Sequence, residues 1–577
     1  MSRKIFLFLF ILGAPLSARQ PNFVLIMCDD LGWADVGFNG GKHIRTPNLN
    51  KMAANGLTLA RFYAQAPVCS PTRASIVTGR HHDRTGIYTA NNGHLRKGEF
   101  TIYEALASKG YATGHFGKWH MGTLTTKVTE SNRGAKSKEN FSPPWQHAVD
   151  TTFATEAKVP TYDAMWKPAG RSSSDFSSSS KHGWHAIPEG AKRTLYGTHY
   201  WTGLDTMVAP ESKDLLGDDS KVIVDHTLDF ISRNKEQPFV AIVWFHAPHL
   251  PVVASPEDVK SYNDGKTTGF QQNYYGCVTA LDRALGRLRD SLREHGIADN
   301  TVVTFCSDNG PEGKEGAPGQ QGPFRGRKRS LHEGGVRVPS LIEWPSKIKA
   351  GSTSDMATCT VDYLPTILEI TGIEIPDDRP LDGISLVPLI EGKATKRSRP
   401  LGFHIKGQAA WHDGTLKAYR GAKSKTWELY DLASDPGEQQ NLIEDAPELA
   451  PWRAALGEAH NAQVSSGWRI KGNLTMKAGE VLTVNLPRAA THAGIIDPEH
   501  TIPNPKNQAW GEPPRRTVDE IGTIALSEDG LSFTWTVGER PRDATLYVLF
   551  EDGGDASVQG TFLLARDEKR LVKKNAL

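Results

Sequence analysis

Three continuous apolar runs stand out along the chain: NFVLIMC (22–28), PFVAIVWF (238–245) and TVVTFCS (301–307). Runs without polar alternation are typical of strands that are covered on both faces. Apolar residues also recur at helical spacing in two segments, 223–231 and 278–292. This alternation predicts an α/β fold, an α/β/α sandwich around a mostly parallel large sheet.

The pattern breaks down between residues 123 and 220. This segment is polar and contains the low-complexity run SSSDFSSSS (172–180). It also carries four tryptophans, Trp145, Trp166, Trp184 and Trp201. Two interpretations stay open: a long surface insertion with some local packing, and a rim that binds substrate.

Two further units are expected after the large domain. WELYDLASDPGEQQNL (427–442) has the pattern of a strand followed by a tight turn, and short strand-like segments follow Gly467. We therefore divide the chain as follows: a targeting segment (1–18), a catalytic α/β domain (19–400, with the insertion 123–220), a smaller C-terminal α+β subdomain (401–466) and an accessory β domain (467–577).

The first residues have the form of a secretory signal peptide. Arg3 and Lys4 precede the apolar run IFLFLFIL (5–12), and small residues follow at Ser17 and Ala18. The run is too short to span a bilayer, and no later stretch is long and apolar enough to do so. We expect an exported protein, either periplasmic or secreted, or lysosomal in a eukaryote.

Composition and charge narrow the function classes. The 577 residues are 38% hydrophobic and 23% charged, as in ordinary globular proteins, and the formal net charge of +2 argues against nucleic acid as a partner. Five scattered cysteines form neither a disulfide framework nor a zinc motif. For Cys28, Cys277 and Cys306 a buried, inert thiol is expected.

Polar side chains gather where the predicted strands end. Parallel strands bring their carboxyl ends to one edge of the sheet, where such folds bind ligands. The residues at these ends are Asp29 and Asp30, Lys118 to His120, His246 to His249, and Asp308 with Asn309. The three carboxylates and the amide form an all-oxygen set, which predicts one hard cation, calcium before magnesium.

The stretch VCSPTRAS (68–75) places Cys69 at the start of a predicted helix. Pro71 suits the first helical turn, and Arg73 lies one turn on. A helix start favours anionic oxygen. A thiolate matches a hard cation poorly, so an oxygen nucleophile would fit this position better.

The motifs resemble those of a known family. CSPTRASIVTGR (69–80) is similar to the signature in which sulfatases oxidise cysteine to formylglycine, and GYATGHFGKWHMG (110–122) is similar to their second signature. The Asp-Asp pair, APHLP, SDNG, GRKRSLHEGGVRVP and ELYDLASDPGEQQNL recur in the same order. The resemblance covers residues 21–445, and it implies a formylglycine-dependent sulfatase of the alkaline-phosphatase superfamily.

The resemblance implies a role for each matching residue. Calcium would be held by Asp29, Asp30, Asp308, Asn309 and an oxygen of the modified Cys69. The formylglycine hydrate would supply the nucleophile, which requires a formylglycine-generating maturation enzyme as a partner. Arg73 would orient the hydrate, while Lys118 and Lys328 would neutralise sulfate oxygens.

Histidines would move the protons. By the same resemblance, His249 would protonate the leaving oxygen and His120 would take a proton from the nucleophile. His246 is expected to contact either the substrate or the inner residues of the site. We expect a solvated basic loop at Arg327 and Arg329, and structural roles for His332 and Glu333.

Two rival functions stay open from sequence: a phosphate mono- or diester hydrolase of the same superfamily, and a catalytically inactive protein that binds sulfated glycans. The aromatic, histidine-rich segment favours a sulfated carbohydrate over a steroid or lipid sulfate.

Overall fold

The computed structural model describes residues 20–442, except 83, 129, 131–139, 171–183, 315, 377–380 and 425, together with strands and short adjoining parts between 481 and 559. The predicted signal peptide and the serine-rich run lie outside the described residues. None of the described helices is long and apolar enough to cross a membrane.

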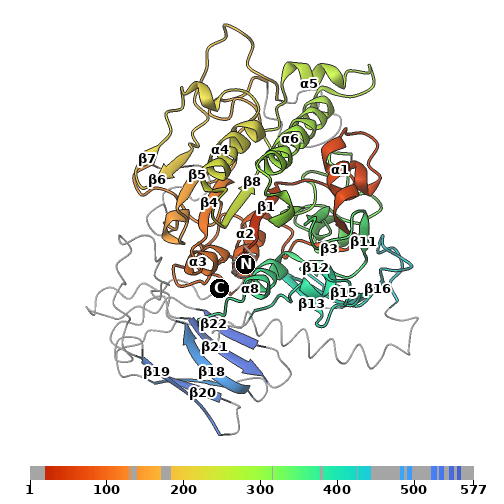
Figure 1. The fold of residues 1–577 in the computed structure, drawn as a ribbon. Helices are drawn as coiled ribbons and strands as arrows, with labels where there is room; N and C mark the ends of the chain where they lie inside the picture. The colour runs from red at the N-terminus through yellow and green to blue at the C-terminus, as the bar shows by residue number, and fades with distance from the viewer. Residues whose placement is uncertain are drawn as a thin grey trace, which may run out of the picture.

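One ten-stranded sheet forms the centre of the large domain (Figure 1). Its strand order is β11-β2-β10-β9-β1-β8-β4-β5-β6-β7. The strands are β1 (Asn22–Cys28), β2 (Leu57–Leu59), β4 (Ala112–Lys118), β5 (Thr151–Thr155), β6 (Trp201–Gly203), β7 (Thr206–Met207), β8 (Phe239–Trp244), β9 (Thr301–Ser307), β10 (Ser340–Glu343) and β11 (Ser352–Ser354). The five neighbours β9, β1, β8, β4 and β5 are parallel, while antiparallel pairs flank them on both sides.

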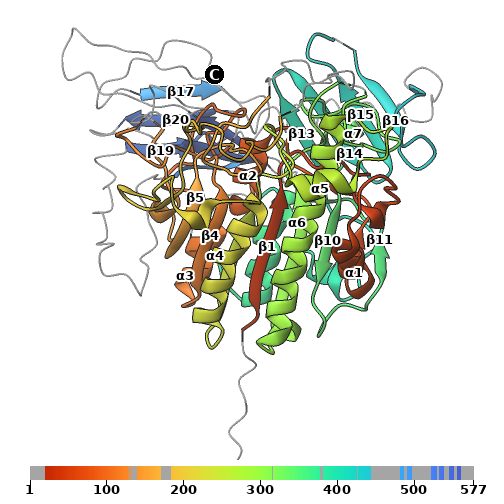
Figure 2. The same cartoon turned by 90° about the horizontal axis from the view of Figure 1, so that it is seen from above.

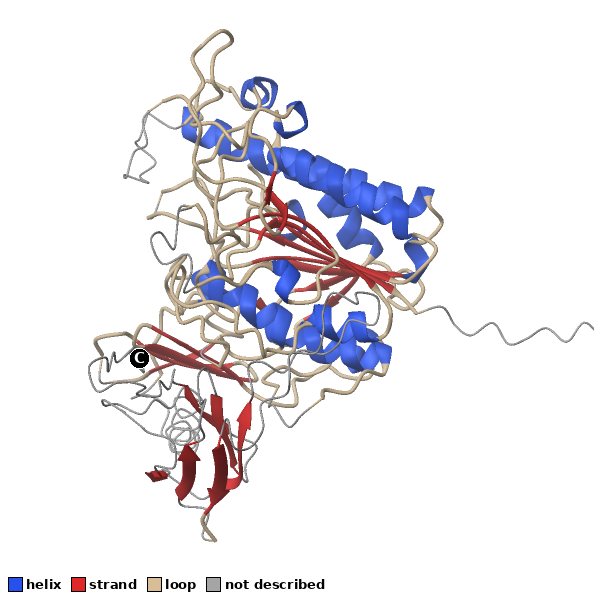
Figure 3. Cartoon of the chain, turned by 90° about the vertical axis from the view of Figure 1, so that its left-hand side faces the viewer, coloured by secondary structure: helices blue, strands red, loops and turns tan. Residues whose placement is uncertain are grey.

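Helices cover both faces of this sheet (Figure 3), which confirms the sandwich predicted from the alternating pattern. Phe23, Leu25 and Met27 of β1 pack on one face, and Val24 and Ile26 pack on the other. The first face carries α2 (Cys69–Thr78), α3 (Ile102–Ser108) and α8 (Tyr363–Thr371). The second carries α1 (Pro47–Asn55), α4 (Asp219–Asn234) and α6 (Gly269–Glu294), and Figure 2 shows α4 and α6 running beside β1 and β4. Other helices are α5 (Pro256–Ser261), α7 (Glu333–Val336) and α9 (Val387–Ile390).

The segment 123–220 is not an insertion throughout, as the first of its two interpretations would require. It contributes β5, β6 and β7 to the main sheet, and β5 pairs in parallel with β4. The threonines of TTFAT hide this strand, because a pattern of apolar runs does not register them. The insertion therefore begins after a fifth parallel strand rather than before it.

A separate four-stranded antiparallel sheet follows the large domain. It consists of β13 (Leu401–Ile405), β14 (Gln408–Asp413), β15 (Leu416–Arg420) and β16 (Glu428–Asp431). A short pair, β3 (Phe62–Tyr63) with β12 (Thr358–Cys359), packs together with the apolar residues of this four-stranded sheet. The division at residue 400 and the helical part of the predicted subdomain stay predictions, since residues 443–480 lie outside the described part.

A buried ion network joins this sheet to the large domain. The Lys417 ammonium lies 3.0 Å from Glu333 and 2.8 Å from Glu438, and all three side chains are buried. Glu438 also accepts a hydrogen bond from the backbone N–H of Glu333 at 2.7 Å. Glu333 therefore has a structural role, as predicted.

The strand-like texture beyond residue 467 corresponds to two three-stranded sheets, β17-β20-β19 and β18-β21-β22. Their strands are β17 (Val481–Asn485), β18 (Ala490–Ile496), β19 (Gly522–Leu526), β20 (Ser532–Val537), β21 (Thr545–Phe550) and β22 (Asp555–Gln559).

Candidate active site

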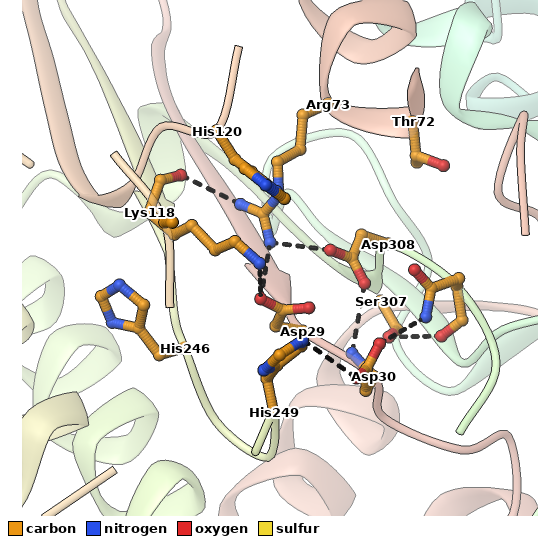
Figure 4. Close-up of polar contacts among 12 residues, drawn as sticks. Asp29, Asp30, Thr72, Arg73, Lys118, His120, His246, His249, Ser307 and Asp308 are labelled. Atoms are coloured by element: carbon orange, nitrogen blue, oxygen red, sulfur yellow. Dashed lines mark hydrogen bonds and ion pairs between the residues drawn. The ribbon is translucent and has the colours of Figure 1, made fainter. Parts of the chain in front are cut away.

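The predicted strand ends meet at one edge of the sheet. Because β9, β1, β8 and β4 are neighbours and parallel, their carboxyl ends bring the predicted polar residues together. Figure 4 shows the carboxylates of Asp29, Asp30 and Asp308 in the middle, with Arg73 and Lys118 on one side and His249 on another.

The three carboxylates form a compact, fully buried cluster. One oxygen from each of Asp29, Asp30 and Asp308 lies within 4.8 Å of the others. Asp30 adopts a left-handed backbone conformation with φ 68°, and its N–H donates to Asp308 Oδ1 at 3.1 Å. Burial and the charge of Asp29 raise the pKa of Asp308 to about 7. Such a cluster needs nearby positive charge to stay ionised.

Two basic side chains supply part of that charge from the β4 side. Arg73 lies 2.7 Å from Asp308 Oδ2 and donates to the Lys118 carbonyl at 3.0 Å. The Lys118 ammonium lies 2.5 Å from Asp29 Oδ2. Burial alone would raise the pKa of Asp29, but Lys118, followed by His249 and Arg73, outweighs it and holds that pKa well below its usual range.

Lys328 reaches the carboxylates from the loop between β9 and α7. Its ammonium lies 2.6 and 2.8 Å from the two oxygens of Asp30. Burial would lower the pKa of Lys328, but Asp30 raises it well above the ordinary value. The lysine is therefore charged and directed into the carboxylate cluster.

The residues present fit a hard cation. Asp29 Oδ1 and Asn309 Oδ1 are buried and have no hydrogen-bond partner among the described residues. Asn309 donates through Nδ2 to Asp30 Oδ1 at 2.7 Å, which leaves its carbonyl oxygen available. Unsatisfied buried oxygens beside three carboxylates form the donor set that calcium or magnesium prefers.

Cys69 is the first residue of α2 and lies beside this cluster. Its sulfur is within 4.8 Å of ligand atoms of Asp29 and His249, and it lines the cavity described below. Burial raises the pKa of the thiol, although Lys118 and Lys328 oppose the shift. An unmodified Cys69 is therefore a neutral thiol rather than a thiolate.

His249 and His120 both line the cavity. His249 donates through Nδ1 to the Leu250 carbonyl at 2.7 Å, and its Nε2 lies 3.6 Å from Asp30. Burial and the charge of Lys328 lower the pKa of His249 well below its ordinary value, against the opposing charge of Asp29. His120 has φ 55°, and its Nε2 lies 2.7 Å from Asn91 Oδ1.

His246 does not reach the cavity, so the expectation that it binds substrate is corrected. It is buried between Asp219, 2.7 Å from Nδ1, and Thr155, 2.7 Å from Nε2. No dashed line joins it to the carboxylates in Figure 4. Its other predicted role, an inner contact that holds the end of β5 against α4, matches these hydrogen bonds.

A cavity of about 470 Å³ opens over the site. Of the four tryptophans in 123–220, only Trp184 lines it. Trp201 is buried and donates to Glu130, whereas Trp166 packs under Arg193 and Trp145 against the core. Of these four tryptophans, Trp184 alone fits the interpretation of the segment as a rim that binds substrate, and the other three have packing roles.

The two arginines of the predicted basic loop, Arg327 and Arg329, have different surroundings. Arg329 is exposed and paired with Glu312, as expected. Arg327 is only partly exposed, and its guanidinium donates to Gln321 and to the carbonyls of Glu312 and Gly319, so it differs from the solvated residue that was expected. Several residues of the cavity lining were missed from sequence, among them Asn91 and Lys158. Recognising TTFAT as a strand would have placed Lys158 at the same sheet edge.

Comparison with known proteins agrees with this site. The Sulfatase family model matches residues 21–373, and a model of the N-sulphoglucosamine sulphohydrolase C-terminal region matches residues 319–461. Steryl-sulfatase of Mus musculus is 30% identical over 535 residues, which cover 77% of this chain and 83% of that protein. N-acetylgalactosamine-6-sulfatase of Sus scrofa is 32% identical over 453 residues, or 74% and 77% of the two chains.

Solved structures extend the similarity. The crystal structure of Ps i-CgsB is 26% identical, with a TM-score of 0.62 over 78% of this chain and 93% of that one. The phosphonate monoester hydrolase of Agrobacterium radiobacter, at 19% identity and a TM-score of 0.53, shares the fold.

The chain belongs to the sulfatase family, and its fold is that of the alkaline-phosphatase-like superfamily. It is accordingly a sulfuric ester hydrolase, which sets aside the prediction of an inactive glycan-binding protein.

Asn91 orients His120, and its removal tests that contact. If His120 transfers a proton as the resemblance implies, Asn91→Ala should lower kcat for a sulfate ester by about 10–100-fold, the low end of what a positioned acid–base group contributes. The measurement is kcat and its pH profile, beside Asn92→Ala, an exposed neighbour outside the cavity lining. Equal rates for the two variants would show that Asn91 does not position His120.

Proposed function

We propose that this protein hydrolyses sulfate esters of a carbohydrate, with formylglycine derived from Cys69 and with one bound calcium ion. The observation that carries the proposal is the position of Cys69. It lies at the start of α2 within 4.8 Å of Asp29 and His249, in a cavity that also holds Lys118 and Lys328. A neutral thiol is a weak nucleophile there, whereas an oxygen nucleophile suits the hard, oxygen-rich surroundings.

Calcium would be held by Asp29, Asp30, Asp308 and Asn309, and would supply Lewis-acid charge at the site. Formylglycine would supply the attacking oxygen. The ammonium groups of Lys118 and Lys328 bind the sulfate oxygens and stabilise the charge that develops on them. Arg73 is fully buried and fixed by Asp308 and the Lys118 carbonyl, so it holds Lys118 and the end of β4 in place.

His249 and His120, on the cavity wall, transfer protons in the proposed reaction. His249 is fixed through Nδ1 by the Leu250 carbonyl, which leaves Nε2 facing the site. Nε2 takes up a proton once the negatively charged sulfate is bound beside it, because a nearby anion favours the charged ring, and it gives that proton to the leaving oxygen. His120, oriented by Asn91, takes the proton that must be removed to regenerate the nucleophile.

The lining of the cavity supports a sulfated carbohydrate. It has five cationic side chains, Lys118, Lys158, Lys328, Arg329 and Lys406, against one acid, Glu312. Trp184 adds one aromatic face of the kind that packs on sugar rings. The named relatives include both a steryl-sulfatase and an N-acetylgalactosamine-6-sulfatase, and Ps i-CgsB has been solved with k-i-k-neocarrahexaose. The polar, cationic wall favours the carbohydrate.

A phosphate mono- or diester hydrolase remains the alternative from the same superfamily. The described residues gather one all-carboxylate cluster at the sheet edge, which favours a single hard cation over a pair of transition metals. The proposed enzyme is exported through the segment 1–18 and depends on a formylglycine-generating maturation enzyme.

Replacing the nucleophile is the direct test of the mechanism. Cys69→Ala should lower the release of sulfate from sulfated oligosaccharides by at least about 10³-fold, because the attacking group is lost. Cys277→Ala, which changes a buried thiol within α6, serves as the matched control and should keep its activity. Turnover by Cys69→Ala at the wild-type rate would rule out residue 69 as the nucleophile.

Calcium binding has a readout that is independent of activity. After chelation, adding calcium to 100 times its Kd should stabilise the protein by about 2.7 kcal/mol and raise Tm. Asp308→Asn should abolish this rise, while Asp290→Asn, an exposed residue on α6, should keep it. A rise with zinc or manganese but not calcium would contradict the assignment and favour the phosphatase alternative.

A further inference from the structure

Lys158 is a cavity residue that none of the recognised motifs contains. It follows β5, which lies at the end of the row of five parallel strands. Lys158 is therefore at the same sheet edge as Lys118, the last residue of the neighbouring β4. Its side chain is half-buried and lines the cavity together with Lys118, His249 and Lys328.

The other basic groups close to the carboxylates each have an acidic partner, and Lys406, the remaining cationic residue of the cavity lining, is exposed. Lys118 pairs with Asp29 and Lys328 with Asp30. The remaining pairs are Arg73 with Asp308 and Arg329 with Glu312. Within the part of the chain that the structure describes, Lys158 has no ion pair.

The positive charge of Lys158 acts on the site. It is one of the causes that lower the pKa of His249. Burial, Lys118 and Lys328 in turn lower the pKa of Lys158 itself. Asp30 and Asp29 oppose this shift, but neither forms an ion pair with Lys158. A half-buried ammonium beside two other ammonium groups and without a paired carboxylate favours an anion from the ligand.

The cavity has room for more than the group that is cleaved. Its volume of about 470 Å³ lies within the range of about 300–1,000 Å³ that is typical of small-molecule sites. Trp184 shares its wall and packs against Phe270, which gives a sugar ring a fixed aromatic surface. The proposed function assigns Lys118 and Lys328 to the sulfate that is cleaved, so Lys158 is available for a neighbouring group.

We propose that Lys158 binds a second anionic group of the same carbohydrate, a sulfate or a carboxylate, beside the sulfate that is hydrolysed. The enzyme then selects glycans that carry at least two negative charges near the cleaved ester. This inference rests on the proposed function, and it names a specificity-determining residue within the same site.

The test compares three oligosaccharides that differ in one neighbouring substituent: a hydroxyl, a second sulfate or a carboxylate. Lys158→Gln should lower kcat/KM for at least one dianionic substrate by about 10–100-fold, the value of a hydrogen bond to a charged group. For the monosulfated substrate the change should stay below about threefold, which also shows that the variant is folded. The substrate that loses most identifies the anion, and Lys158→Arg should restore part of the rate.

Lys221→Gln, which changes an exposed lysine on α4, is the matched control and should leave all three rates unchanged. An equal loss on all three substrates would mean that Lys158 acts on the cleaved sulfate. No loss on any of them would mean that Lys158 binds no anion. Either result overturns the inference about Lys158 and leaves the proposed function standing. If the wild-type protein, isolated with formylglycine at position 69, hydrolysed none of the three, the proposed function would fail with it.

Discussion

The burial of three carboxylates at one sheet edge is the constraint on which the site depends. Asp29, Asp30 and Asp308 lie within 4.8 Å of one another and are screened from water, so their repulsion must be offset locally. Arg73, Lys118 and Lys328 each place a cationic group against one of them. Within this site Asp29 Oδ1 and Asn309 Oδ1 have no hydrogen-bond partner among the described residues, and a divalent cation bound there would complete the charge balance.

The same constraint explains why so much was predictable from sequence. NFVLIMC and TVVTFCS coincide with β1 and β9 to the residue, because a central parallel strand is apolar on both faces. Asp29 and Asp30 follow β1 and Asp308 follows β9, so these acids lie at the same edge of the sheet. The motifs then placed Cys69, Lys118 and Lys328 around that edge, where the structure brings them together.

What escaped prediction depends on side-chain environment and on polar strands. TTFAT lacks a continuous apolar run, so the sequence pattern places β5 and the Lys158 that follows it in the insertion 123–220 and not in the sheet. His246 and His249 are three residues apart, yet one is buried against Asp219 and the other faces the cavity. No local pattern distinguishes those two orientations, since they are set by packing between α4, β5 and β8.

The central claim is that residue 69 acts as formylglycine, and the mass of the tryptic peptide 62–73 tests it most directly. Protein produced together with an active maturation enzyme should yield a peptide in which an aldehyde has replaced the thiol of Cys69 and which reacts with a hydrazide probe. An intact thiol at position 69 in catalytically active protein would contradict the claim, because the sulfate ester would then have to be cleaved by another group.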